Sequence, residues 1–250
     1  MRGFRPRLWP TAFTVPAVLV LLALGTWQVQ RLHWKEGLIA ERQAGLAAPV
    51  APWAEAARDP AGYLWHRVSA RGRFLHDREL VLAARSMNGN PGYHIVTPFE
   101  VAGGGSALLI DRGWVPLDRK DPAARAEGQV AGEVAVTGIL RPAHQPNWLT
   151  PDNDPEKNFW FWIDLPAMAR AAGLEGGAVT DVYLEAGAEP NPGGFPIGGQ
   201  TRTALPNDHL QYAITWYALA LALIVIYVLY HRGEGGHTGR PAVEGRETPE

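Results

Sequence analysis

The hydrophobic pattern divides the chain into two long apolar segments separated by a region in which apolar and polar residues alternate. The first apolar segment holds 23 residues without a charged side chain, from Leu8 to Gln30, and the second holds 21, from Leu210 to Tyr230. At about 1.5 Å of rise per residue, a helix of either length crosses a hydrocarbon layer about 30 Å thick. Because lipid offers the backbone no hydrogen bonds, both segments are predicted to be transmembrane helices.

The start of the chain, MRGFRPR, is also typical of the basic region of a secretory signal peptide. The apolar run that follows is long, however, and it leads into GTWQVQRLHWK, which has no small-residue cleavage pattern. We therefore interpret the first segment as a retained span. Since no Arg- and Ser-rich presequence stands before it, a bacterial inner membrane is expected.

Basic residues near the spans predict the orientation of the chain in the membrane. The first span is flanked almost equally, but the second has one basic residue before it, Arg202, and three after it, Arg232, Arg240 and Arg246. Basic residues are enriched in cytoplasmic segments, whereas long loops cross regardless of charge. We therefore expect a cytoplasmic N-terminus (1–7), a first span (8–30), a periplasmic β-rich domain (31–208), a second span (209–230) and a disordered cytoplasmic tail (231–250).

The region between the spans has the pattern of a β-rich domain. In HRVSARGRF, alternation places Val68, Ala70 and Phe74 on one face of a strand. Further strands are predicted in ELVLAAR, GYHIVTPFEV, SALLIDRGWVP, GEVAVTGIL, FWFWID and DVYLEA. The segment DLPAMARAAG predicts a short helix capped by Asp164 and ended by Gly173, and RLHWKEGLIAERQAG predicts that the first helix continues beyond the membrane. The predicted fold class is a membrane protein in which two transmembrane α-helices flank an extracytoplasmic α+β domain, with an antiparallel sheet or a barrel.

Composition excludes several classes of function. Apolar residues make up 46% of the chain and the net charge is −2, which argues against disorder and against nucleic-acid binding. Cysteine is absent, so disulfides and thiolate metal sites are excluded. With only three methionines besides, a copper-delivery role is disfavoured.

The chain also lacks the common catalytic motifs. It contains no G-x-S-x-G, H-E-x-x-H or Walker sequence. The acidic residues of TPDNDPEKN are interpreted as a solvated turn. Four histidines lack zinc-ligand spacing and are interpreted as surface or strand-packed residues: His66, His76, His94 and His144. We therefore expect that the protein is not an enzyme.

Candidate binding residues gather at the outer ends of the two spans. Trp27, Arg31 and Trp34 share one helical face at the end of the first span. At the start of the second span, Tyr212 follows His209, and a shared face carries His209, Ala213 and Trp216. An aromatic belt at the headgroup level would explain the aromatic residues without any ligand.

His209 is the residue with the most distinctive chemistry in this group. A neutral imidazole at this depth can serve as an axial ligand of haem iron, and the surrounding aromatic residues offer flat faces for a macrocycle. Arg31 and Arg202 could pair with haem propionates. The residues alone leave two alternatives open, a pH-sensitive group and a partly solvated interfacial histidine.

Six sequence blocks follow one another along the chain from about Leu24 to Ala220: LGTWQVQRLHWKEGLI, GYHIVTPF, DRGWVP, GQVAGEVAVTGILR, GGFPIGGQTR and NDHLQYAITWYALA. In this order they resemble the blocks of the surfeit locus protein one family of assembly factors for haem–copper cytochrome c oxidase. The resemblance implies two spans around a soluble domain outside the membrane. It also implies a role in maturing the largest oxidase subunit.

The same resemblance implies that haem a is bound as a transient cargo, with His209 as the axial ligand of its iron. The expected cofactor-binding residues are Trp27, Arg31, Arg202, His209, Tyr212 and Trp216. The expected partners are the largest subunit of cytochrome c oxidase, the haem a synthesis machinery and the lipid bilayer. The alternative function is a scaffold that stabilises an oxidase assembly intermediate without binding haem.

Overall fold

The structure is a computed structural model that describes residues 6–104, 106–143, 146–174 and 176–233. It contains two compact units, one formed by residues 40–204 and the other by the described parts of residues 1–39 and 205–250. Helix α1 (Leu8–Ala47) begins in the second of these units and ends in the first. Most of the tail predicted to be disordered, from residue 234 onward, lies outside the described residues.

The unit that contains the termini consists of α1 and α4 (His209–Gly233), and both helices are long and apolar enough to cross a membrane. The mean hydropathy of the most apolar 18-residue window is 1.9 in α1 and 2.2 in α4. Helix α1 continues to Ala47, as the sequence predicted, and α4 ends three residues after the predicted span 209–230. The positions of the membrane boundaries stay a prediction.

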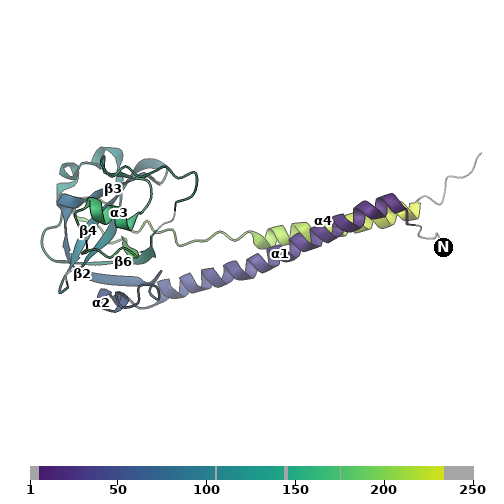
Figure 1. Ribbon diagram of the computed structural model, residues 1–250, viewed down its shortest axis with the longest axis horizontal. Helices are drawn as coiled ribbons and strands as arrows, with labels where there is room; N and C mark the ends of the chain where they lie inside the picture. The colour runs from purple at the N-terminus through teal and green to yellow at the C-terminus, as the bar shows by residue number, and fades with distance from the viewer. Residues whose placement is uncertain (1–5, 105, 144–145, 175, 234–250) are drawn as a thin grey trace, which may run out of the picture. The chain divides into compact units, whose positions relative to one another are not determined.

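Helices α1 and α4 pack side by side in opposite directions (Figure 1). Three hydrogen-bonded pairs join them in antiparallel order: Thr11 with Tyr227, Thr26 with Tyr217, and Gln28 with His209. Ala213 and Ala220 are almost completely buried. Small side chains let two helix backbones approach closely, and hydroxyl and amide groups can then bond across the interface.

The unit formed by residues 40–204 contains a closed five-stranded barrel. Its strands are β2 (Arg67–Phe74), β6 (Val134–Pro142), β8 (Val182–Ala186), β5 (Ala107–Pro116) and β4 (Asn90–Val101), in that order around the ring. The ring closes because β2 pairs with β6 on one side and with β4 on the other. Three strands extend the sheet at its margins: β3 (Leu80–Met87) on β4, β7 (Phe159–Trp160) on β3, and β1 (Ala51–Pro52) on β2.

The sequence predicted an antiparallel sheet or a barrel; the barrel is confirmed, but its sheet is mixed rather than antiparallel. Five strands in a closed ring cannot alternate direction all the way round, so one neighbouring pair must be parallel. That pair is β5 and β8, while the other four pairs of the ring are antiparallel. The strand predicted in FWFWID is short and covers only Phe159–Trp160, because the backbone N–H groups of Phe161 and Trp162 donate to the side chain of Asn153.

The remaining elements are short. They are α2 (Trp53–Ala56), α3 (Leu165–Ala171) and the 3-10 segments His76–Arg78, Leu117–Arg119, Pro122–Gly128 and Pro192–Gly194. The predicted start of α3 is confirmed, because the Asp164 carboxylate accepts a hydrogen bond from the backbone N–H of Ala167 at 3.1 Å. Gly173 follows the helix with a φ of +66°, a conformation that glycine adopts without steric cost.

The core has two layers, one on each face of β5. Leu108 and Ile110 join a buried cluster with Val68 and Ala70 of β2, two of the residues predicted to share the inward face. Leu109 belongs to a second cluster on the opposite face, together with residues of α3 such as Met168. Strand β5 is buried over nearly its whole length because the barrel interior covers one face and the α3 layer covers the other.

A buried carboxylate, Glu79, lies between two buried arginines. Its oxygens accept hydrogen bonds from Arg125 at 2.6 Å and from Arg112 at 3.3 Å, and His76, Thr97 and Gln129 also contact it. Burial raises the pKa of Glu79, but the hydrogen bonds from His76 and Arg125 and the charges of the two arginines outweigh it, and they lower the pKa to about 2. The cluster ties the segment before β3 to β5 and to the 3-10 segment Pro122–Gly128.

Candidate functional site

His209 lies at the first position of α4, half-buried against α1, where its Nδ1 is 2.7 Å from Oε1 of Gln28. A carbonyl oxygen only accepts hydrogen bonds, so in this arrangement Nδ1 carries the proton and donates it to Gln28. The proton is thereby placed away from Nε2, which keeps its lone pair. A histidine held in this tautomer by a partner on its other nitrogen is the usual form of a metal-ligating imidazole.

The neighbours of Gln28 on α1 fix the register of the helix pair at the same level. Gly25 contacts the ring of Tyr217 so closely that an added Cβ would stand 2.8 Å from Cε1 of that ring. The hydroxyl groups of Thr26 and Tyr217 are 3.1 Å apart. The sequence Gly-Thr-Trp-Gln therefore provides a small residue for close approach, a hydroxyl for pairing and an amide for His209 within a single helical turn.

Trp27, Arg31 and Trp34 lie on one face of α1, as the i, i+4, i+7 spacing predicted. The guanidinium carbon of Arg31 is 5.6 Å from the ring centre of Trp27 and 5.2 Å from that of Trp34. Arg31 is exposed, and the two indoles are about half exposed. A guanidinium between two aromatic faces is stabilised by cation–π attraction, and its N–H groups stay available to an anion.

The two aromatic residues predicted from the second span have different surroundings. Tyr212 is exposed, whereas Trp216 is partly buried and its indole Nε1 is inaccessible to solvent. Within the part of the chain that the structure describes, that Nε1 has no hydrogen-bond partner.

Arg202, the sixth predicted residue, belongs to the unit formed by residues 40–204, whereas Arg31 and His209 belong to the helix pair. Its side chain is exposed. A shared ligand site of the six residues stays a prediction, and the structure groups Arg202 with residues of the sheet.

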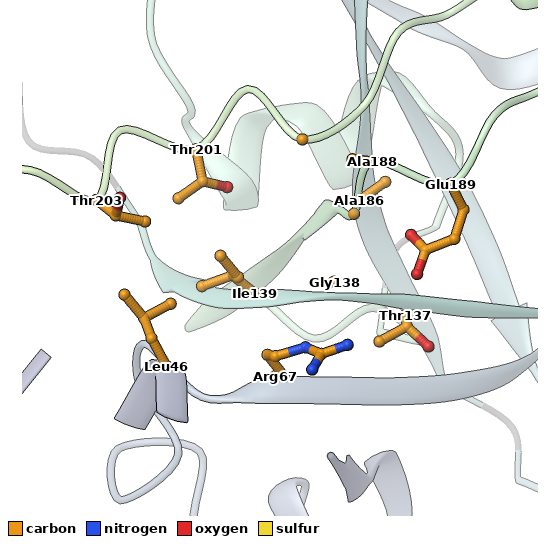
Figure 2. Close-up of a pocket in the computed structure, with 12 residues that line it drawn as sticks. Leu46, Arg67, Thr137, Gly138, Ile139, Ala186, Ala188, Glu189, Thr201 and Thr203 are labelled. Atoms are coloured by element: carbon orange, nitrogen blue, oxygen red, sulfur yellow. The ribbon is translucent and has the colours of Figure 1, made fainter. Parts of the chain in front are cut away.

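A cavity of about 610 Å³ in the β unit lies beside β6, and none of the predicted site residues lines it. Figure 2 shows Leu46 and Thr203 at one end of it and Thr137 and Glu189 at the other. The lining combines small and threonine side chains with Arg67 and Glu189. This lining does not favour any particular ligand chemistry.

Of the four histidines interpreted as surface or strand-packed residues, the three that the structure describes contact protein groups. His66 lies 3.2 Å from the backbone oxygen of Leu64, His76 contacts Glu79, and His94 contacts Asp111 at 2.8 Å. His144 lies outside the described residues. Sequence reasoning missed both carboxylate partners: Asp111 lies 17 positions after His94 and reaches it across the sheet, whereas Glu79 is only three positions after His76 and could have been considered.

Sequence reasoning also missed the role of Gln28. The residue stands 181 positions before His209, and it carries no charge that would attract attention. The available signal was its place one residue after Trp27, at the level where the second apolar segment begins. Gln28 and His209 come into contact only because the two helices pair in antiparallel order.

Comparison with known proteins places the chain in a family. The model of the SURF1 family matches residues 15–221. The chain belongs to the SURF1 family. The match confirms the resemblance found in the sequence blocks, and it includes Gln28, His209 and all the strands of the barrel.

Individual SURF1 relatives are similar over most of the chain. A SURF1-like protein of Monosiga brevicollis is 36% identical over 241 residues, which cover 92% of this chain and 90% of the relative. Surfeit locus protein 1 of Mus musculus is 37% identical over 80% of this chain and 68% of its own length. Surfeit locus protein 1 of Homo sapiens is 37% identical over 80% of this chain and 70% of its own length.

Proposed function

We propose that this chain is a membrane-bound assembly factor for haem–copper cytochrome c oxidase that binds haem a and assists its insertion into the largest oxidase subunit. Membership of the SURF1 family, known as a family of cytochrome oxidase assembly factors, supports the assembly role. The two apolar helices support a membrane location. In this proposal the inner membrane is bacterial, both termini are cytoplasmic and the β unit is periplasmic.

The contact between Gln28 and His209 carries the haem part of the proposal. It holds the imidazole by Nδ1 and leaves the lone pair of Nε2 as a donor for iron. The residues therefore fit the group in donor type and tautomer. Haem a would be cargo, held through an axial bond that can be exchanged for one in the oxidase subunit.

The other candidate residues have supporting roles in this proposal. Trp27, Tyr212 and Trp216 supply aromatic faces for the macrocycle, and Arg31 and Arg202 supply positive charge for its propionates. Binding and release require no covalent chemistry from the chain, so in this proposal the protein does not act as an enzyme. The haem a synthesis machinery is the proposed source of the cargo.

The test is the visible spectrum of the full chain, purified from cells that make haem a, beside the spectra of His209→Ala and His33→Ala. His33 is the matched control because it is a second histidine near the ends of the apolar segments, exposed on α1. We expect a haem a Soret band in the wild type and in His33→Ala, and loss or a strong shift of the band in His209→Ala.

Three other results would count against the proposal. Equal spectra for the wild type and His209→Ala would remove His209 as the required ligand. Loss of the band only in His33→Ala would move the ligand to α1. Absence of haem from all three proteins, with haem a synthesis verified in the cells, would favour a scaffold that never binds haem.

A further inference from the structure

A polar cleft of about 600 Å³ lies on the face of the sheet opposite the barrel interior, beside the α3 layer. Residues of β3, β4, β5, β6 and β8 form its floor, and the segment 161–163 and residues 200 and 202 contribute to its walls. None of the residues assigned to the helix pair contributes to it. The volume is within the range of small-molecule sites.

A β-bulge directs Arg85 toward this cleft. In the pairing of β3 with β4, Leu82 faces His94 but Arg85 faces Gly92, so one extra residue is inserted between the two pairs. The inserted stretch contains Ala84, whose φ is +55°. Without the bulge, strict alternation would send Arg85 to the other face, away from Leu82 and His94.

A second bulge places the acidic partner of His94. In the pairing of β4 with β5, His94 faces Trp114 but Val96 faces Asp111, and Gly113 in the inserted stretch has a φ of +110°. Asp111 thereby reaches the same face as His94, and its Oδ2 lies 2.8 Å from Nδ1 of the imidazole. Bulges are frequent beside functional sites because they redirect side chains.

The two carboxylates of the cleft already have partners. Asp111 is bonded to His94 and also accepts a hydrogen bond from the backbone N–H of Gly113 at 2.9 Å. Glu185 accepts from Arg141 at 3.0 Å and from the hydroxyl of Tyr183 at 2.8 Å. Both acidic groups are therefore satisfied within the sheet.

The arginines of the cleft are less well compensated. Arg85 is half-buried, yet neither its guanidinium group nor that of Arg202 makes a hydrogen bond or an ion pair with any residue in the described ranges. Burial lowers the pKa of Arg85, and the positive charge of Arg202 lowers it further against the attraction of Asp111 and Glu185. The Nε of Arg141 is also buried without a partner among the described residues. A partly buried guanidinium without an anion is energetically costly.

The charge count indicates what would complete the cleft. It contains three guanidinium groups and two carboxylates, which leaves one uncompensated positive charge when His94 is neutral. Leu82, Phe161 and Trp162 add apolar surface beside the arginines. We infer that this cleft binds the carboxylate of an organic monoanion with an apolar body, through the guanidinium groups of Arg85 and Arg202.

A carboxylate suits the cleft better than a phosphate. The planar fork of an arginine matches both groups, but a phosphate dianion would bring a second negative charge toward Asp111 and Glu185. Two sources share the carboxylate chemistry, a free organic acid and a propionate arm of haem. The site itself does not depend on haem binding at His209, and only the second source rests on the proposed function.

The test is fluorine NMR of 4-fluorobenzoate mixed with the full chain in detergent micelles. Binding broadens the fluorine resonance, and 4-fluorobenzamide, the neutral analogue, measures insertion into the micelle. We expect broadening of the benzoate only, with binding about tenfold weaker or more in Arg85→Gln and in Arg202→Gln. Arg71→Gln is the matched control, because Arg71 is an exposed arginine of β2 outside the cleft, and it should bind like the wild type.

Arg202→Gln keeps the test decisive if Arg85→Gln fails to fold, because the Arg202 side chain is exposed. Equal broadening by benzoate and benzamide would overturn the proposal, and so would equal binding by the wild type and a folded Arg202→Gln. Displacement of the benzoate by inorganic phosphate at equal concentration would overturn the assignment to a carboxylate.

A competition experiment separates the two sources. If the natural ligand is a haem propionate, we expect haem to displace the benzoate. The dimethyl ester of haem, which has no free carboxylate, should not displace it. If neither displaces it, the site serves a free organic acid. Either result leaves the carboxylate site standing, even if the His209→Ala spectra refute haem binding at α4.

Discussion

Replacing Glu79 by glutamine removes the negative charge between Arg112 and Arg125 while keeping the shape of the side chain. Glu79 is 9% exposed, and Arg112 and Arg125 are 1% and 5% exposed, so water cannot replace the lost charge. Breaking a buried ion pair on one side leaves the remaining charges without compensation, which is costlier than removing the whole group. We therefore expect Glu79→Gln to destabilise the β unit strongly.

The pKa of Glu79 gives the size of the effect. The difference between its ordinary value of 4.5 and about 2 corresponds to about 3 kcal/mol of preference for the ionised form in the folded state. Because the folded-state pKa is the lower one, this stabilisation is complete above about pH 4.5. It is lost as the pH falls toward 2, since the unfolded chain takes up the proton first.

Thermal unfolding of the full chain in detergent, followed by near-ultraviolet circular dichroism, measures both effects. Glu79→Gln should lower the free energy of unfolding at neutral pH by about 3 kcal/mol, and its stability should depend less on pH between 4.5 and 2 than that of the wild type. Glu100→Gln is the matched control, because Glu100 pairs with Arg73 at the surface and should change stability by less than about 1 kcal/mol. If the two variants lose the same stability, the buried cluster does not have the energetic role assigned to it.

Two further predictions concern close approaches of glycine. Gly25→Val should weaken the pairing of α1 with α4 by about 1–2 kcal/mol, since an added Cβ would stand 2.8 Å from the ring of Tyr217. Gly37→Val is the control, because a Cβ at Gly37 would have nothing within 4 Å. Equal thermal midpoints for the two variants would contradict the close packing at Gly25. Gly113→Ala should cost more than about 3 kcal/mol because the residue has a φ of +110° and its Cβ would lie 2.0 Å from the backbone oxygen of Ile197; Gly104→Ala, in open space, should unfold like the wild type.

The regular elements could be predicted from the sequence because each depends on a local pattern. The apolar runs define α1 and α4, and the alternation in HRVSARGRF defines β2 with Val68 and Ala70 facing inward. The Asp164 cap and Gly173 define the limits of α3 for the same reason. Closure of the barrel does not have a local signal. The pairing of β2 with β4, and the parallel pairing of β5 with β8 that a ring of five strands requires, arise only in three dimensions.

The candidate sites were predictable only in part, because they depend on contacts between distant residues. His209 could be singled out by its place at the end of an apolar run, but its partner Gln28 required the register of the helix pair. In ELVLAAR, strict alternation would turn Arg85 to the face opposite that of Leu82. The bulge at Ala84 places it on the same face instead, and no residue in the segment signals the bulge, because alanine rarely adopts a positive φ.

The chemistry of Gln28 bears on how a site at His209 would hold and release its cargo. A carboxylate in that place would add negative charge to the imidazole and strengthen its bond to iron, whereas a neutral amide fixes the ring and the tautomer without doing so. The hydrogen bond itself contributes about 1 kcal/mol, enough to favour one tautomer several-fold. A protein that passes its ligand on needs this combination of an oriented donor and a bond that is not the strongest available. Thr26 on the same helical turn bonds Tyr217, so the contact that orients His209 depends on the pairing of the two helices.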